Sequence, residues 1–596
     1  MFQKMIKNKS HLLGIITIFF FIYVTHIWID FFYIATFNVD FPKYYDYLNY
    51  FLGLDVQIDF GQGVLYYFLI SILFRNRLDN LELSNMDVIL SSTIHNINLL
   101  LFIFGLLGIY KLLISKGISN LNSIISLIAL VLFPQAIYMR AVMKPEILCF
   151  AVLPWCIYFV ERYFQSKNIL YIFYSLPFLV ISLNTKASAA GMVLLFLLFS
   201  YNKIFKVLEF KKILILFVVL IIIILIIQFE TYLITDKTPF ERPYDPEYDY
   251  KANYNILFRF SPSHIIESPF FDYDYQDNYY NKNSLSAINL ILLDTFGDYF
   301  NQLFDSNVQY FSKNRKDFLI TGSTMLINEN REINYDGPLS GLLATKMNYI
   351  RKLLAACISF IFFGLVIYYI FKDRENRHFY LAPFFGLFVL YLNSIGIPTN
   401  NFNLLKGDTF KAFYFSFLLC ICFAFVFAKI FQDSTIIKVL VLFIFSLCIV
   451  FISGHPKVNS QSESERLIAV NEYSLFCEIN NLLIFENKII NNIHKSGNIY
   501  NYESDCNKKT TSNDLLRNNR IEYDLKYKND CINNIEKKEN IQNENASISN
   551  ICRIYTIEKA KAQTELPLRI PFFSLLLLFI AFFFSIKKGI FDEKIN

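Results

Sequence analysis

Long runs of apolar residues, with few or no charges, set the strongest limit on what this chain can fold into. Two examples are Ile213–Ile227 and Ile358–Phe371. A helix of about 20 apolar residues is roughly 30 Å long, which is the thickness of the hydrocarbon layer of a bilayer. A helix on a soluble core would interrupt such a run with polar residues in each turn. The runs therefore predict an all-α polytopic membrane protein.

Hydropathy places about twelve transmembrane helices along the 596 residues. The first apolar stretch runs from Leu12 to Ile34, which is longer than the apolar region of a signal peptide, and no clear small-residue cleavage site follows it. We therefore expect it to be retained as a span. The expected spans lie near residues 12–36, 94–115, 121–139, 147–164, 169–185, 188–205, 212–233, 350–371, 379–396, 412–430, 436–453 and 569–586.

Basic residues gather in alternate connections between these spans, and this pattern predicts the orientation. Because cytoplasmic loops carry the excess of lysine and arginine, these connections and both termini are expected to be cytoplasmic. Lys346, Arg351 and Lys352 depart from the pattern, but they adjoin a long outside loop, where the rule is weak. The basic connections contain Lys4, Lys7, Lys9, Lys111, Lys116, Arg162, Lys167, Lys203, Lys206, Lys211, Lys212, Lys372, Arg374, Arg377, Lys429, Lys438, Lys587 and Lys588.

The segment Val64–Phe74 decides whether this count holds. It is apolar and precedes Arg75 and Arg77, so a crossing here would turn every later basic connection outward. It is also too short to span the bilayer. We therefore interpret it as an interfacial or re-entrant helix within the first external loop.

The predicted organisation has five parts. They are an N-terminal membrane module at 1–233, which includes the first external loop at 37–93; a large external loop at 234–349; transmembrane helices 8–11 at 350–453; an extracytoplasmic domain at 454–567, small and either α/β or irregular; and the last helix with a cytoplasmic tail at 568–596.

Cysteine usage supports an outside location for the 454–567 domain. Cys477, Cys506, Cys531 and Cys552 all lie there, and an even number in a small extracytoplasmic domain suggests two disulfides. Three pairings are open, and four free thiols are the alternative. The remaining cysteines lie in apolar spans, where a cysteine usually acts as a small core residue.

Polar residues of interest lie at the outer ends of the predicted spans. His26 and Asp30 are in the outer half of the first span, and Asp40 follows it directly. A proton pump or transporter would place such groups near the bilayer centre. The head group of a lipid-linked substrate would instead lie at the outer boundary.

The region after Asp40 has the pattern of an interfacial helix that Pro42 could begin. The side chains at helical spacing are Tyr44, Tyr47, Leu48 and Phe51. A rigid helix end would hold Asp40 at the membrane boundary. The alternative is a helix-capping aspartate beside an ordinary aromatic belt.

Two further clusters combine charges at predicted outer turns. Arg140, Lys144 and Glu146 could pair with one another, or they could converge with Asp40 around a substrate. In the second cluster, Lys406 and Lys411 flank Asp408. Lysine at a helix N-terminus suits a phosphate, but lysines that snorkel to the boundary would look the same.

These motifs together resemble the GT-C superfamily of polyprenyl-phosphate-dependent glycosyltransferases. The stretch Asp40-Phe-Pro-Lys-Tyr-Tyr is similar to the Asp-Pro-x-x-x-Tyr pattern of the first external loop in oligosaccharyltransferase-like members, with Phe41 inserted. The segment from Asp59 to Tyr67 looks like a "PPLYY" segment without its prolines. The stretches Arg140–Glu146 and Lys406–Tyr414 are similar to later external loops of the family. The resemblance covers about residues 12–430.

The resemblance implies transfer of a sugar from a polyprenyl-phosphate donor to an acceptor hydroxyl, with inversion, at the outer face of a bacterial inner or plasma membrane. In that reading Asp40 is the catalytic base, and Glu146 orients the acceptor or joins Asp40 in binding a divalent cation, Mg or Mn. The acceptor is a cell-envelope glycan, a lipid or a protein, and no nucleic-acid partner is expected. Donor phosphate contacts are assigned to Lys406, Lys411, Arg140 and Tyr414, and acceptor or sugar contacts to Asp46, Asp59, Asp298 and Asp408.

Two other classes of function stay open on the sequence. A transporter, flippase or glycan polymerase would share the span count but should line a mid-membrane cavity with polar groups. A non-catalytic membrane scaffold would use its outside domains to bind partners.

Overall fold

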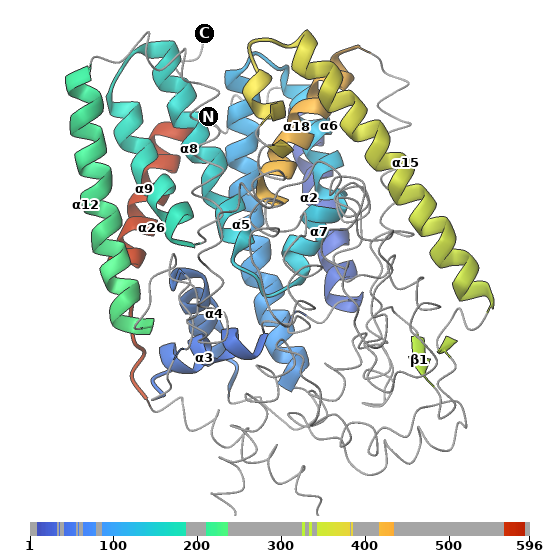
Figure 1. The fold of residues 1–596 in the computed structure, drawn as a ribbon, viewed down its shortest axis with the longest axis horizontal. Coiled ribbons are helices and arrows are strands. Elements are labelled where there is room, and N and C mark those ends of the chain that lie inside the picture. The colour runs from blue at the N-terminus through green and yellow to red at the C-terminus, as the bar shows by residue number, and fades with distance from the viewer. Residues whose placement is uncertain are drawn as a thin grey trace, which may run out of the picture.

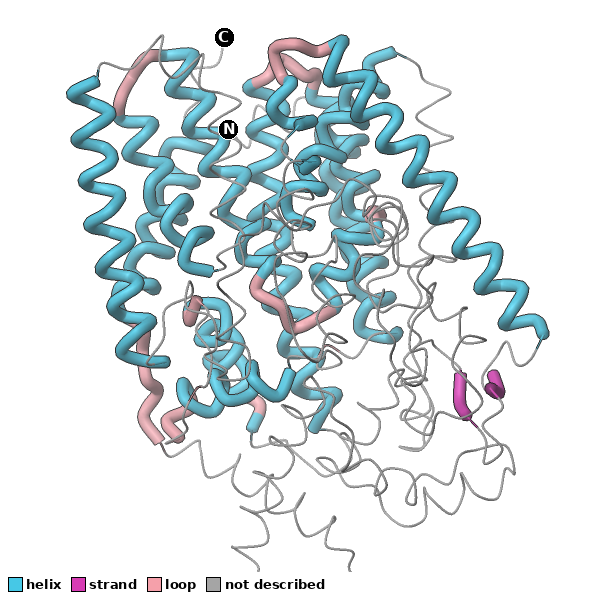
Figure 2. Tube along the Cα trace, viewed as in Figure 1, coloured by secondary structure: helices cyan, strands magenta, loops and turns pink. Residues whose placement is uncertain are grey.

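The computed structural model describes part of the chain. The described residues are 9–32, 35, 41–54, 58, 63–78, 86–185, 210–235, 325–327, 333–335, 342–381, 383–384, 416–433 and 566–590. Within them the protein is mostly helical, as Figure 2 shows. The helices are α2 (Lys9–Phe32), α3 (Phe41–Phe51), α4 (Leu65–Arg75), α5 (Met86–Ser115), α6 (Asn120–Val131), α7 (Pro134–Ala141), α8 (Glu146–Ser166), α9 (Leu170–Thr185), α12 (Phe210–Thr235), α15 (Leu342–Lys372), α18 (Ser416–Asp433) and α26 (Phe572–Phe584), which continues as the π-helix η8 (Ser585–Ile590).

Four of the described helices are long and apolar enough to cross a membrane: Ile89–Ser115, Glu146–Ser166, Phe217–Thr235 and Phe572–Gly589. The bent pair α6–α7 makes a fifth if it counts as one span. Large apolar side chains on these helices face outward without protein cover, such as Phe229 (58% exposed) and Leu233 (63% exposed). These features identify an integral membrane protein of the all-α class. The expected spans at 188–205 and 436–453, and most of 379–396, lie outside the described residues.

A pair of short strands lies in the region predicted as the large external loop. Strands β1 (Met325–Ile327) and β2 (Ile333–Tyr335) pair antiparallel, with Met325 opposite Tyr335. Helix α15 begins at Leu342, earlier than the predicted span near 350, and at about 1.5 Å per residue it is about 46 Å long. It therefore extends beyond the thickness of the hydrocarbon layer.

The chain between α2 and α5 starts and finishes at one end of the bundle. The backbone N–H of Ala35, just after α2, donates to the Ser91 hydroxyl near the start of α5 at 3.1 Å. Helix α4 lies within this stretch and has only 11 residues, about 16 Å, so it cannot cross. In Figure 1, α3 and α4 lie side by side at the lower end of the bundle. We call this end the α3 end. The interpretation of Val64–Phe74 as a helix that does not cross agrees with this geometry.

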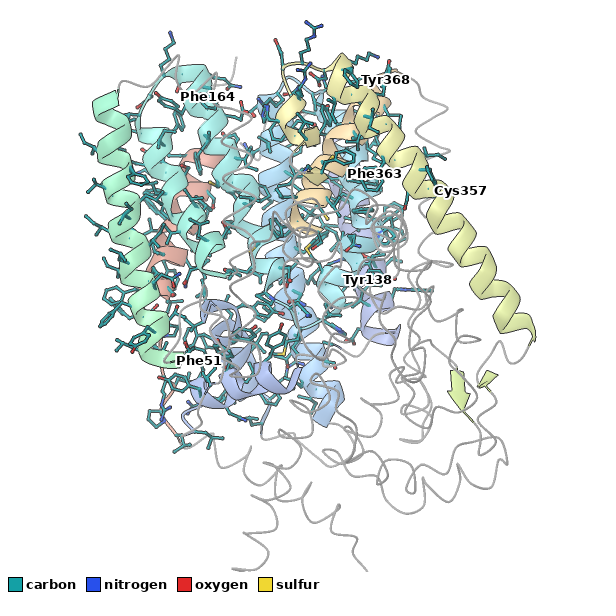
Figure 3. All side chains as sticks on the ribbon, viewed as in Figure 1. Phe51, Tyr138, Phe164, Cys357, Phe363 and Tyr368 are labelled. Carbon is teal, nitrogen blue, oxygen red and sulfur yellow. The ribbon has the colours of Figure 1, made fainter. Side chains whose placement is uncertain are left out.

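The expected span at 121–139 is not one straight helix but two, α6 and α7, at an angle of 59°. Pro134 opens α7, and a proline has no backbone N–H and holds the preceding residue out of the helical region. Phe133 is accordingly extended, with φ −68° and ψ 128°. The break turns α7 into the bundle, where Tyr138, labelled in Figure 3, is buried.

Helices α5 and α8 form the closest pair in the bundle because α5 presents glycine to α8. A Cβ at Gly105 would lie 2.5 Å from the Phe150 ring, and one at Gly108 would lie 3.0 Å from Pro154. Small residues at such spacing let helix backbones approach in a membrane. Phe102 and Phe150 stack beside this contact, with ring centroids 5.1 Å apart.

At the end opposite α3, ion pairs join four parts of the chain. Glu161 of α8 pairs with Lys116, which follows α5, and with His378, whose Nε2 lies 3.0 Å from Oε1. Asp373, just after α15, pairs with Lys429 of α18 at 3.2 Å. All members come from connections predicted as basic or from helix ends beside them. The structure therefore brings residues of several basic connections to one end of the bundle.

The last helix is fastened to α12 by a carboxylate. Glu230 is 7% exposed. Its two oxygens accept hydrogen bonds from the backbone N–H groups of Phe573 and Ser574, at 2.7 and 2.8 Å, and from the Ser574 hydroxyl at 2.5 Å. The first N–H groups of a helix have no partner within the helix, and a negative charge there also favours the helix dipole. Glu230 thus caps α26 from another helix.

Glu230→Ala should lower the free energy of unfolding by about 2 kcal/mol, because two amides and a hydroxyl would lose their acceptor in apolar surroundings. The measurement is thermal unfolding of the purified protein in detergent. Tyr232→Phe, on the exposed face of the same helix, is the matched control. Equal unfolding of the two variants would contradict the capping role.

Candidate functional site at the α3 end

Three tyrosines form the centre of the α3 end. The rings of Tyr47 and Tyr67 stack with centroids 4.4 Å apart, and Tyr44 lies 5.2 Å from Tyr67. All three are fully buried. Tyr44 and Tyr47 belong to the predicted apolar face of α3. That face packs on α4 instead of lying on lipid, because α4 supplies a long apolar surface of its own.

The turn between α7 and α8, residues 142–145, is bonded to the segment after α2 and to α5. The N–H of Met143 donates to the Ala35 carbonyl after α2 at 2.9 Å. Asn98 of α5 donates to the carbonyls of Arg140 and Val142, both at 3.0 Å. We call residues 142–145 the α7–α8 turn. Because its backbone groups are buried away from water, such partners are required for the turn to be stable.

The hydroxyl of Tyr66 connects α4 to the same turn. It donates to Asn98 Oδ1 at 2.9 Å and also hydrogen-bonds the backbone of Lys144. Gly63, just before α4, makes the approach possible: a Cβ there would lie 2.5 Å from the Asn184 carbonyl at the end of α9. The start of helix α4 therefore lies between the end of α9 and the α7–α8 turn.

Lys144 and Glu146 present opposite charges beside the tyrosines. Glu146 is the first residue of α8 and fully buried, where the helix dipole favours a carboxylate. Lys144 is 4% exposed, and its Nζ lies 5.9 Å from the centroid of the Tyr44 ring. Burial raises the pKa of Tyr66 and of Tyr67 well above the ordinary tyrosine value, and the charge of Glu146 acts in the same direction. Both phenols therefore keep their protons, and Tyr66 donates its own to Asn98.

Arg140 lies deeper in the bundle than Lys144 and Glu146. Its guanidinium donates to the Thr25 hydroxyl at 2.8 Å and to the carbonyls of Val131 and Ala136 at 3.0 and 3.2 Å. It also lies 4.5 Å above the Phe102 ring. These contacts join α7 to α2 and, through the Val131 carbonyl, to the end of α6. The role of Arg140 in binding the donor phosphate stays a prediction.

The structure reaches only part of the predicted site. Asp46 lies on α3, where only its backbone is described. Glu146 and Lys144 lie beside the tyrosines at the α3 end, while the Arg140 side chain is held deeper in the bundle. The residues outside the described ranges are Asp40, Asp59, Asp298, Lys406, Asp408, Lys411, Tyr414, Cys477, Cys506, Cys531 and Cys552. Among the described residues, no three His, Cys, Asp or Glu side chains gather as metal ligands. Glu146 could contribute one carboxylate to a divalent cation, and Asp40 would have to supply the second.

Sequence reasoning missed His95 and Asn98. They lie three residues apart at the start of an apolar run, so they share one face of α5. That spacing of two polar residues was the sequence pattern that could have indicated a polar contact on α5. They bind carbonyls more than 40 residues away in the chain. No local sequence pattern predicts these partners.

No protein-family model, curated protein or solved structure matches this chain.

Arg140→Lys should lower the free energy of unfolding by about 2 kcal/mol, since an ammonium cannot reproduce the guanidinium fork in a buried site. Thr25→Val removes one of the acceptors and should cost about 1 kcal/mol. Arg374→Lys, an exposed position at the opposite end, makes the same chemical change as a control. Thermal unfolding in detergent compares the three variants. An Arg140→Lys protein as stable as the control would show that these contacts do not hold α7.

Proposed function

We propose that this protein is a membrane glycosyltransferase that moves a sugar from a polyprenyl-phosphate donor to an extracytoplasmic acceptor, with inversion at the anomeric carbon. The observation that carries the proposal is the buried group formed by Lys144, Glu146 and the tyrosines of α3 and α4. Helix α3 begins one residue after Asp40. The resemblance of these motifs to the GT-C superfamily supplies the reaction class.

The place of these groups in the bundle supports the proposal. They lie at the end where the chain between α2 and α5 starts and finishes, while residues of the basic connections gather at the other end. By the positive-inside rule the α3 end is the non-cytoplasmic one. The phosphate and sugar of a lipid-linked donor would lie at that boundary, with the polyprenyl chain in the bilayer beside the exposed apolar faces of the helices.

The proposed step is a single displacement. The acceptor oxygen forms a bond to the anomeric carbon as the bond from that carbon to the phosphate oxygen breaks, and Asp40 takes the hydroxyl proton. The departing polyprenyl phosphate gains negative charge, which Lys406 and Lys411 would stabilise. Glu146 accepts a hydrogen bond from the acceptor and orients it, and Lys144 adds positive charge at the same turn.

The test is transfer of a radiolabelled sugar from polyprenyl phosphate by membranes that contain each variant at matched expression. Asp40→Asn should reduce transfer at least 100-fold, because a positioned general base contributes about that much. Glu146→Gln keeps the size of the side chain but not its charge, and should reduce transfer about tenfold.

Glu375→Gln is the control, since it makes the same change at an exposed residue of the opposite end. It should transfer sugar at the wild-type rate. Wild-type transfer by well-expressed Asp40→Asn would remove the proposed base. Movement of labelled lipid across the membrane without any transfer of sugar would favour a flippase instead.

A further inference from the structure

His95 of α5 bridges two groups that both accept hydrogen bonds. Its Nε2 lies 3.0 Å from the Ala141 carbonyl, and its Nδ1 lies 3.0 Å from Asp30 Oδ1 on α2. A carbonyl oxygen can only accept, so Nε2 must carry a hydrogen. A neutral imidazole has a single N–H, and a carboxylate has none. The three groups can therefore all be satisfied only if Asp30 and His95 share one additional proton.

The bond to Ala141 acts on the α7–α8 turn. Ala141 is the last residue of α7, and the final carbonyls of a helix have no partner within it. Asn98 donates to the carbonyls of Arg140 and Val142, and His95 donates to the carbonyl of Ala141 between them. Two side chains of α5 thus hold three successive carbonyls, immediately before Lys144 and Glu146.

Asp30 gives the shared proton a way to exchange with its surroundings. The side chain of His95 is fully buried, whereas that of Asp30 is 45% exposed. The other titratable or charged groups that the described residues place around the pair are His26 on α2 and Arg140 on α7. The positive charge of Arg140 opposes further protonation, while the single proton between Nδ1 and Oδ1 is required by the hydrogen-bond geometry.

We propose that the Asp30–His95 pair is a positioning device for the transfer reaction: its shared proton keeps His95 bonded to Ala141 and so holds the turn that presents Lys144 and Glu146. This inference rests on the proposed function. When the pH rises and the proton leaves, the single N–H of the neutral imidazole can serve only one of the two acceptors. Donated from Nδ1 to the Asp30 carboxylate, it leaves Nε2 as an acceptor facing the Ala141 carbonyl, and the contact with the turn is lost. The pair therefore stabilises the turn on the acid side and ceases to do so on the alkaline side.

Asp30→Asn tests the shared proton directly. The amide of asparagine donates to the bare Nδ1 of a neutral imidazole, whose Nε2–H still binds Ala141, so the whole arrangement is satisfied without an additional proton. Wild-type transfer should fall from about pH 6 to about pH 9, the range that brackets the ordinary titration of imidazole. The Asp30→Asn protein should match the wild type at the acid end and lose less than half as much at the alkaline end.

Two substitutions of His95 separate its two contacts. Glutamine places an amide N–H near the position of Nε2 and can still bind Ala141, whereas asparagine is shorter and reaches only toward Asp30. We expect His95→Gln to keep kcat within about threefold of the wild type, and His95→Asn to lower kcat more than tenfold while KM for the donor changes less. A wild-type kcat for His95→Asn would overturn the proposal.

Thermal unfolding of the wild type and Asp30→Asn in detergent, over the same pH range, keeps this inference distinct from the proposed function. The wild type should lose stability toward alkaline pH, and Asp30→Asn should not. If that result is obtained but no variant transfers sugar, the shared proton is upheld and the glycosyltransferase proposal fails. If the wild type transfers sugar and both proteins have the same alkaline loss in both measurements, the positioning role is overturned.

Discussion

The constraint on which the α3 end depends is that buried backbone carbonyls in a membrane protein need partners that water cannot supply. Helix α7 has only eight residues and ends inside the bundle, so its last carbonyls face protein on every side. His95 and Asn98 meet this need from α5, and Met143 bonds back to the end of α2. The positions of Lys144 and Glu146 follow from that arrangement, because both lie within a few residues of the carbonyls that are held.

Among the described residues, the two ends of the bundle use charged side chains differently. Glu161, with Lys116 and His378, joins helices whose sequences are far apart, and its carboxylate pairs with both partners. The α3 end instead combines charged side chains with tyrosine hydroxyls, which can donate to an oxygen-rich ligand. Between them the described interior is dominated by aromatic and aliphatic packing, such as the stack of Phe133 on Phe423 at 4.2 Å. The proposed reaction, at a head group on one boundary, needs no polar path through the middle.

Hydropathy predicted the helices α8, α12 and α26 well, because a membrane span is a local property that a run of residues carries by itself. The helical spacing of Tyr44, Tyr47, Leu48 and Phe51 likewise predicted the buried face of α3. The break at Pro134 was missed because the span at 121–139 reads as continuous when only hydropathy is scored. The partners of His95 and Arg140 could not be predicted, since contacts such as Arg140 with Thr25 join residues 115 positions apart. The residues proposed for catalysis were chosen by motif, and Asp40 and Lys411 lie outside the described ranges.

Glu230 also has a consequence for how the chain is made. Its partners Phe573 and Ser574 follow it by 343 and 344 residues. At about 5–20 residues per second, a ribosome needs roughly 17–70 s to reach them. During that interval the Glu230 side chain has no helix to cap, because α26 has not been synthesised. The contact that joins α12 to the last helix can therefore form only after α26 has been made, so this part of the α3 end is completed late in synthesis.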